Sequence, residues 1–163
     1  MPTLTHTDLD EAQVREQIGR DVRGRWGVAH RCHLGLPTVI ENHPLVEGRP
    51  FPTLFWLTCP LLVKRISRQE AAGRMAALNE RLGSDEALHD RLAAAVDALR
   101  ARRDAHAEIE DSGSPPGGGP DRVKCLHAHA AQELAGLPDP IGALALTEAG
   151  FPDCVRPCVG SAR

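Results

Sequence analysis

The spacing of hydrophobic positions in the first third of the chain predicts one helix followed by three short strands. Apolar side chains recur at helical spacing over residues 7–20, behind a capping-box pattern. Residues 26–32 and 37–41 are rich in strand-forming side chains and are joined by a glycine-containing turn. The run FPTLFWLT at 51–58 is apolar and bounded by prolines, which predicts a third, buried strand.

The rest of the chain shows the period of helices. The capping-box pattern SRQE predicts a helix over 67–82, which a glycine ends. A longer amphipathic helix is expected over 85–110, another helix over 121–135, and a turn of helix at 140–148. We therefore expect the second half of the chain to be helical between its loops.

A segment rich in proline and glycine interrupts this helical half. Residues 111–120 predict a flexible loop within a single domain that spans 1–163. The tail, 150–163, is also rich in these residues, carries two cysteines and is expected to be irregular. The predicted fold is α+β, with a small sheet of about three short strands packed against several helices and an irregular C-terminal tail.

Composition and charge narrow the class of protein. A chain of 163 residues with 42% hydrophobic residues can bury a core, which excludes disorder throughout. The net charge of −3 argues against nucleic-acid binding through bulk charge. No apolar run is long enough to span a membrane and the N-terminus lacks signal-peptide features, so we expect a cytoplasmic protein without membrane contact.

Thiols are kept reduced in the cytoplasm, so the five cysteines indicate metal binding, catalysis or burial rather than disulfides. Cys32 and Cys59 end two predicted strands and Cys125 lies near a helix start, positions that can present three side chains to one point. His129 follows Cys125 by one helical turn on the same face, which makes it the expected fourth ligand. Soft thiolate ligands select zinc or an iron–sulfur cluster.

Further candidates lie near these residues. The tail pair Cys154 and Cys158 can wrap both sulfurs onto one ion, and we rank it behind the first three cysteines. His127 points away from the face of the expected helical ligands and is a candidate acid or base, and Arg31 is a second catalytic candidate. Basic residues near the first strand, and the free amides of a helix that begins at Ser67, indicate a small anionic ligand.

Several long phrases, among them PFPTLFWLTCPLLVK and RVKCLHAH, carry a resemblance to a known family. Over roughly residues 14–160 the chain resembles the bacterial, mainly actinobacterial, family catalogued as domain of unknown function 501. The resemblance implies that the motif residues of the family fall on Cys32, Cys59, Cys125, His127 and His129. Genes of this family often neighbour those of a septum-formation initiator and an exopolyphosphatase, which implies an association with cell division or phosphate metabolism.

Three hypotheses for the function follow. The first is a metal-site protein in which Cys32, Cys59 and Cys125 hold an iron–sulfur cluster or zinc and act on an anionic substrate. The second is a metal-free adaptor that binds a cell-division protein through the 85–110 helix or its basic face, with its cysteines in the core. The third is a thiol enzyme with Cys125 as nucleophile and a neighbouring histidine as base.

Overall fold

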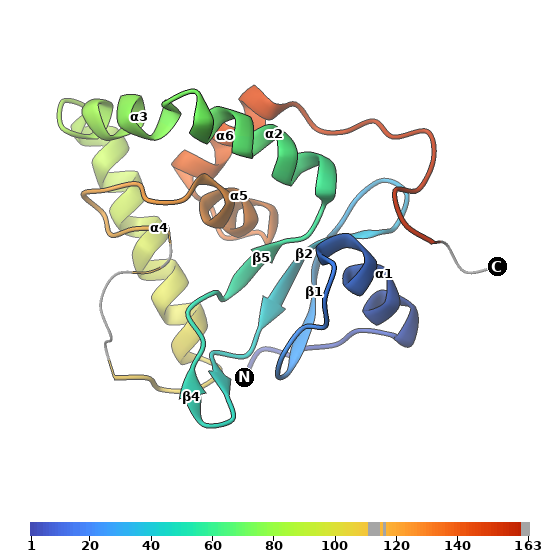
Figure 1. The fold of residues 1–163 in the computed structure, drawn as a ribbon. Coiled ribbons are helices and arrows are strands. Elements are labelled where there is room, and N and C mark those ends of the chain that lie inside the picture. The colour runs from blue at the N-terminus through green and yellow to red at the C-terminus, as the bar shows by residue number, and fades with distance from the viewer. Residues whose placement is uncertain (111–114, 116, 161–163) are drawn as a thin grey trace.

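The computed structural model describes residues 1–110, 115 and 117–160 of the chain (Figure 1). Its centre is an antiparallel sheet in which β2 lies between the two other strands. The three strands are β1 (Trp26–Arg31), β2 (Pro37–Asn42) and β5 (Phe55–Leu57). A short hairpin of β3 (Leu45–Val46) and β4 (Arg49–Pro50) lies between β2 and β5 in the chain.

The described residues form six helices around this sheet. They are α1 (Asp8–Ile18), α2 (Pro60–Ala71), α3 (Arg74–Leu82), α4 (Glu86–Asp104), α5 (Leu126–Leu134) and α6 (Pro140–Ala149). Helix α1 packs against β2, helix α5 packs against β5, and α2 and α6 pack on α5. The fold is therefore α+β, as the sequence predicts.

Strand β2 is buried along its whole length because both of its faces are covered. Successive side chains of a strand point to opposite faces of the sheet. Val39 accordingly belongs to the large core that the helices from α2 to α6 build, whereas Ile40 belongs to a smaller core with Val14 and Trp26 beneath α1. Helix α1 and the other helices thus cover opposite faces of the sheet (Figure 1).

The helix expected over 67–82 is wrong at its start, because two helices occupy this region. Helix α2 begins at Pro60, a residue that suits the first helical position because the amide there needs no partner. Gly73, with a φ of 81°, separates α2 from α3. Ser67 therefore lies inside α2 and has no free helix-terminal amides to offer an anion.

The helix expected over 121–135 begins later than predicted, at Leu126. The Asn79 side chain explains this start, because it accepts a hydrogen bond from the Val123 amide at 2.7 Å and donates one to the Val123 carbonyl oxygen at 3.0 Å. These two bonds hold the residues before α5 against α3. Cys125 is consequently extended, with φ −152° and ψ 112°, and precedes the helix.

The other expected elements differ in extent rather than in kind. The predicted strands at 26–32 and 37–41 are confirmed as β1 and β2, and the turn of helix at 140–148 is confirmed as α6. The strand expected over 51–58 is shorter, since only Phe55–Leu57 pairs with β2. The helix expected over 85–110 ends at Asp104.

The structure describes only part of the predicted loop and of the tail. Of the loop predicted at 111–120, residues 111–114 and 116 lie outside the described residues, as do residues 161–163 of the tail. From 150 to 160 the tail contains neither helix nor strand. Within the described ranges, none of the helices combines the length and the apolar composition that a membrane crossing requires.

Candidate metal centre

Helix α2 and the start of α5 bring three potential metal ligands together. Glu70 lies near the end of α2, Cys125 is the residue before α5, and His127 is in the first turn of α5. A Glu70 carboxylate oxygen accepts a hydrogen bond of 2.8 Å from the Leu126 amide. This bond satisfies one of the free amides at the helix start and fixes the carboxylate beside the other two side chains.

The ligand atoms of Glu70, Cys125 and His127 lie within 4.8 Å of one another. His127 Nδ1 is 3.2 Å from Glu70 Oε1 and 4.0 Å from Cys125 Sγ. All three residues are half-buried, so the group is neither sealed in the core nor fully in water. This is a group of sulfur, nitrogen and oxygen donors that could hold a metal ion.

Nε2 of His127 is hydrogen-bonded, which leaves Nδ1 available to a ligand. His127 Nε2 lies 3.2 Å from the Val63 carbonyl oxygen and 3.1 Å from Ser67 Oγ. Because a carbonyl oxygen can only accept, Nε2 carries the hydrogen and donates it to Val63. Nδ1 is then left facing Glu70 and Cys125. A histidine that binds a metal through one nitrogen commonly donates from the other to a carbonyl in this way.

The charges in this group shift the pKa values of His127 and Cys125 in opposite directions. Contact with Cys125 raises the pKa of His127 to about 8. Burial acts in the opposite direction, and the Glu70 carboxylate adds to the increase. Burial alone would raise the pKa of the Cys125 thiol, but His127 and the Ala128 amide outweigh it and lower that pKa. A lowered thiol pKa suits both metal ligation and nucleophilic chemistry.

The structure divides the three cysteines that the sequence grouped. Cys32 and Cys59 line one pocket together with Cys154 and Cys158, whereas Cys125 lies with Glu70 and His127. Cys32 directly follows β1, and Cys59 is the residue before α2. That these cysteines bind a metal stays a prediction, but the tail pair ranked second by sequence is the one that joins Cys32 and Cys59.

His129, the expected fourth ligand, is engaged elsewhere. It is buried, with Nδ1 2.7 Å from Asp139 Oδ2 and Nε2 2.9 Å from the Gly117 carbonyl oxygen. The expected pairing on one helical face with Cys125 is wrong in its geometry, because Cys125 lies outside the helix. His129 instead joins α5 to the start of α6 and to the chain before α5.

Arg31, the second catalytic candidate, takes part in an ion pair. Its guanidinium donates to both carboxylate oxygens of the buried Asp10, at 2.6 and 2.9 Å. Arg20, from the same basic stretch, lies over the ring of Trp56 with its guanidinium carbon 4.9 Å from the ring centroid. Arg31 thereby joins β1 to α1, and Arg20 covers Trp56 of β5.

Glu70 is the member of the group that the sequence did not assign to a site. The SRQE pattern marked it as a capping residue of its own helix, whereas it caps α5 in the structure. His127, a candidate acid or base by sequence, lies beside Glu70 and Cys125, and that chemical role stays a prediction. Glu70 and Cys125 are far apart in the sequence, so no short motif could reveal that they lie close together.

Comparison with known proteins identifies the family. The sequence model described as "Protein of unknown function (DUF501)" matches residues 28–147, most of the chain. The chain belongs to the DUF501 family. Glu70, Cys125 and His127 of this DUF501 chain all lie inside the matched range, whereas Cys154 and Cys158 lie beyond it. Neither the curated proteins nor the solved structures contain a match.

Proposed function

We propose that this DUF501 chain is a zinc-dependent protein whose metal is bound by Glu70, Cys125 and His127. One observation carries the proposal: the three ligand atoms lie within 4.8 Å of one another while the Val63 carbonyl oxygen orients His127. Mixed sulfur, nitrogen and oxygen donors suit zinc better than magnesium or calcium, which prefer oxygen alone. A group of three protein ligands is typical of catalytic zinc, which keeps a fourth position for water or substrate.

The contact between His127 and Glu70 supports this reading. Once Nε2 donates to Val63, the bare Nδ1 faces a carboxylate that only accepts hydrogen bonds, at 3.2 Å. Two acceptors at this distance repel unless a proton or a metal cation lies between them. Zinc would therefore replace a proton at Nδ1, and would act on its fourth ligand as a Lewis acid.

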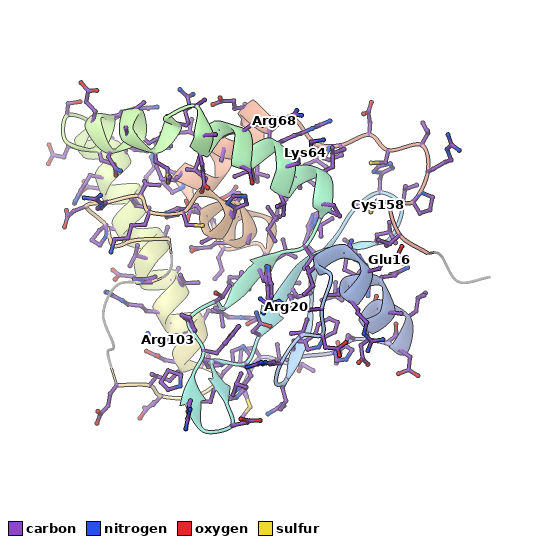
Figure 2. The ribbon with its side chains drawn as sticks, viewed as in Figure 1. Glu16, Arg20, Lys64, Arg68, Arg103 and Cys158 are labelled. Carbon is purple, nitrogen blue, oxygen red and sulfur yellow. The ribbon has the colours of Figure 1, made fainter. Side chains whose placement is uncertain are left out.

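The surface of α2 beside this group supports an anionic substrate. Lys64 and Arg68 are exposed and lie along the outer edge of α2, on either side of Ser67 in sequence (Figure 2). In the ranges that the structure describes, neither forms an ion pair within 4.0 Å. Because Ser67 contacts His127, these two cations are close enough along the helix to attract a negatively charged ligand toward the metal.

Alkylation of Cys125 tests the zinc proposal at the residue itself. The purified chain is treated with iodoacetamide at neutral pH, with and without zinc, and the Cys125 peptide is quantified by mass spectrometry. We expect zinc to slow alkylation of Cys125 by about tenfold or more, because a metal-bound thiolate is a poor nucleophile. Glu70→Gln and His127→Gln should weaken this protection, whereas Glu80→Gln, an exposed glutamate on α3, should retain it.

Two outcomes would contradict the proposal. Cys125 alkylation that saturating zinc leaves unchanged would exclude a zinc ligand at this position. Rapid, selective alkylation of Cys125 that is equally insensitive to zinc would instead support the thiol-enzyme hypothesis, with His127 as the activating base.

A further inference from the structure

We propose a second metal centre, an iron–sulfur cluster held by Cys32, Cys59, Cys154 and Cys158. It is independent of the zinc proposal, because the two centres share no ligand. The four cysteines come from three separate parts of the chain and line one pocket. Four thiolates are the usual ligand set of both two-iron and four-iron clusters.

The pocket walls between the cysteines are mainly apolar. Leu34 and Leu36 contribute from the turn between β1 and β2, and Phe151 and Pro152 contribute from the tail. Pro152 and Leu36 are buried, whereas the cysteines range from buried Cys59 to exposed Cys158. A partly apolar pocket of this kind shields an iron–sulfur cluster from water while leaving one edge open to the surface.

The tail is held at this pocket although it contains no regular secondary structure. The His33 ring contacts the Cys154 carbonyl oxygen through Nε2 at 2.8 Å. Beyond Cys158, the Gly160 carbonyl oxygen accepts a hydrogen bond from the Gln13 side chain at 3.1 Å, and the Gly160 backbone amide donates one to the Glu16 carboxylate at 3.2 Å. Figure 2 shows the tail returning past α1, where Cys158 and Glu16 are labelled. These bonds hold the backbone at Cys154 and beyond Cys158 against the turn after β1 and against α1, so the tail runs along the pocket.

The Cys59 thiol lies close enough to the tail cysteines for them to contribute to its raised pKa. Burial raises the pKa of the Cys59 thiol, while the amides of Leu62 and Leu61 at the helix start lower it. Cys158 and Cys154 raise the pKa of Cys59 further, as expected of thiols near enough to repel each other when ionised.

Four cysteine thiolates suit either a structural zinc ion or an iron–sulfur cluster. Zinc with bonds of about 2.3 Å to four sulfurs would bring those sulfurs to about 3.8 Å from one another, whereas a cluster holds its thiolates farther apart because iron and sulfide atoms lie between them. The identity of the bound metal therefore distinguishes the two.

Anaerobic reconstitution tests this centre. The purified full-length chain is incubated with ferrous iron and sulfide under reducing conditions and desalted, and its iron, zinc, sulfide and visible absorbance are measured. We expect iron and sulfide in equal amounts and a broad visible absorption. Cys158→Ser should lower the bound iron by about tenfold, and it is chosen because this exposed residue is the least needed for folding.

Cys125→Ser is the matched control, and it should retain the iron because Cys125 belongs to the other group. Three results would overturn the cluster: no bound iron in the wild-type chain, zinc bound by these thiols in place of iron, or iron lost from Cys125→Ser but kept by Cys158→Ser. Failure here leaves the zinc protection of Cys125 unaffected, so the two proposals fail separately.

Discussion

His127 is the residue whose two nitrogens define the chemistry of the zinc group. Nε2 is committed to the Val63 carbonyl oxygen, and Nδ1 faces Glu70 and Cys125. In the metal-free chain a proton on Nδ1 satisfies this arrangement, which agrees with a His127 pKa of about 8. Metal and proton therefore compete for the same atom, and zinc should bind more weakly as the solution becomes acidic.

Asp10 supplies a pH-dependent contribution to stability, remote from the zinc group. The Arg31 guanidinium beside it, together with Thr7, lowers the pKa of this buried carboxyl from 3.8 to about 2. Because the folded pKa lies below the ordinary value, the interaction stabilises the fold above about pH 5. That contribution, about 2 kcal/mol, is lost as the pH falls from about 4 toward 2.

We therefore expect Asp10→Asn to lower the free energy of unfolding by about 2 kcal/mol at pH 7 and by progressively less at acidic pH. Urea denaturation of both proteins between pH 3 and pH 7 measures this difference. Asp8→Asn, an exposed residue in the same first turn of α1, is the control and should change stability little. A difference between wild type and Asp10→Asn that stays constant with pH would show that Arg31 does not lower this pKa.

At the scale of elements, the sequence shows which segments are helices more clearly than where they begin. The helical spacing of apolar residues in α1 and α4 is a local property, and these two helices, like the turn of helix expected at α6, are confirmed close to their expected ranges. The start of α5 depends on Asn79, a residue of another helix, so no pattern near Cys125 reveals it. The same long-range dependence hides Glu70, whose contact with Leu126 crosses from α2 to α5.

The packing of α6 on α5 depends on a glycine. A Cβ atom at Gly142 would lie 2.1 Å from the His129 carbonyl oxygen and 2.9 Å from the Glu133 Cβ atom, which is closer than atoms can approach. We expect Gly142→Ala to separate the two helices and to lower the free energy of unfolding by about 2–3 kcal/mol. Chemical denaturation of the metal-free chain measures this loss.

Gly136→Ala is an informative comparison, because its φ of 88° strains any other residue although no atom lies within 4 Å of the added carbon. Its cost should come from backbone conformation alone, about 1 kcal/mol. Gly142→Ala should therefore be the more damaging substitution. If Gly142→Ala unfolds at the same denaturant concentration as the wild type, α5 and α6 do not pack as closely as the structure indicates.

At the scale of the whole molecule, the chain brings two of the three cysteines grouped by sequence into one pocket with the tail pair. The expected meeting of Cys32 with Cys59 agrees with this pocket, whereas the expected meeting of both with Cys125 does not. Sequence could not show that the irregular tail returns to that pocket, because its position depends on contacts with α1 far away in the chain. The fold thus separates the five thiols into a group of four and one that lies with Glu70 and His127.

The most direct test of the zinc proposal is the zinc X-ray absorption spectrum of the Cys158→Ser chain loaded with one equivalent of zinc. This substitution removes a ligand of the four-cysteine pocket and leaves Glu70, Cys125 and His127 intact. We predict one sulfur at about 2.3 Å and nitrogen or oxygen ligands at about 2.0–2.2 Å. A zinc shell with no sulfur, or with three or more sulfurs, would contradict a centre built from these three residues.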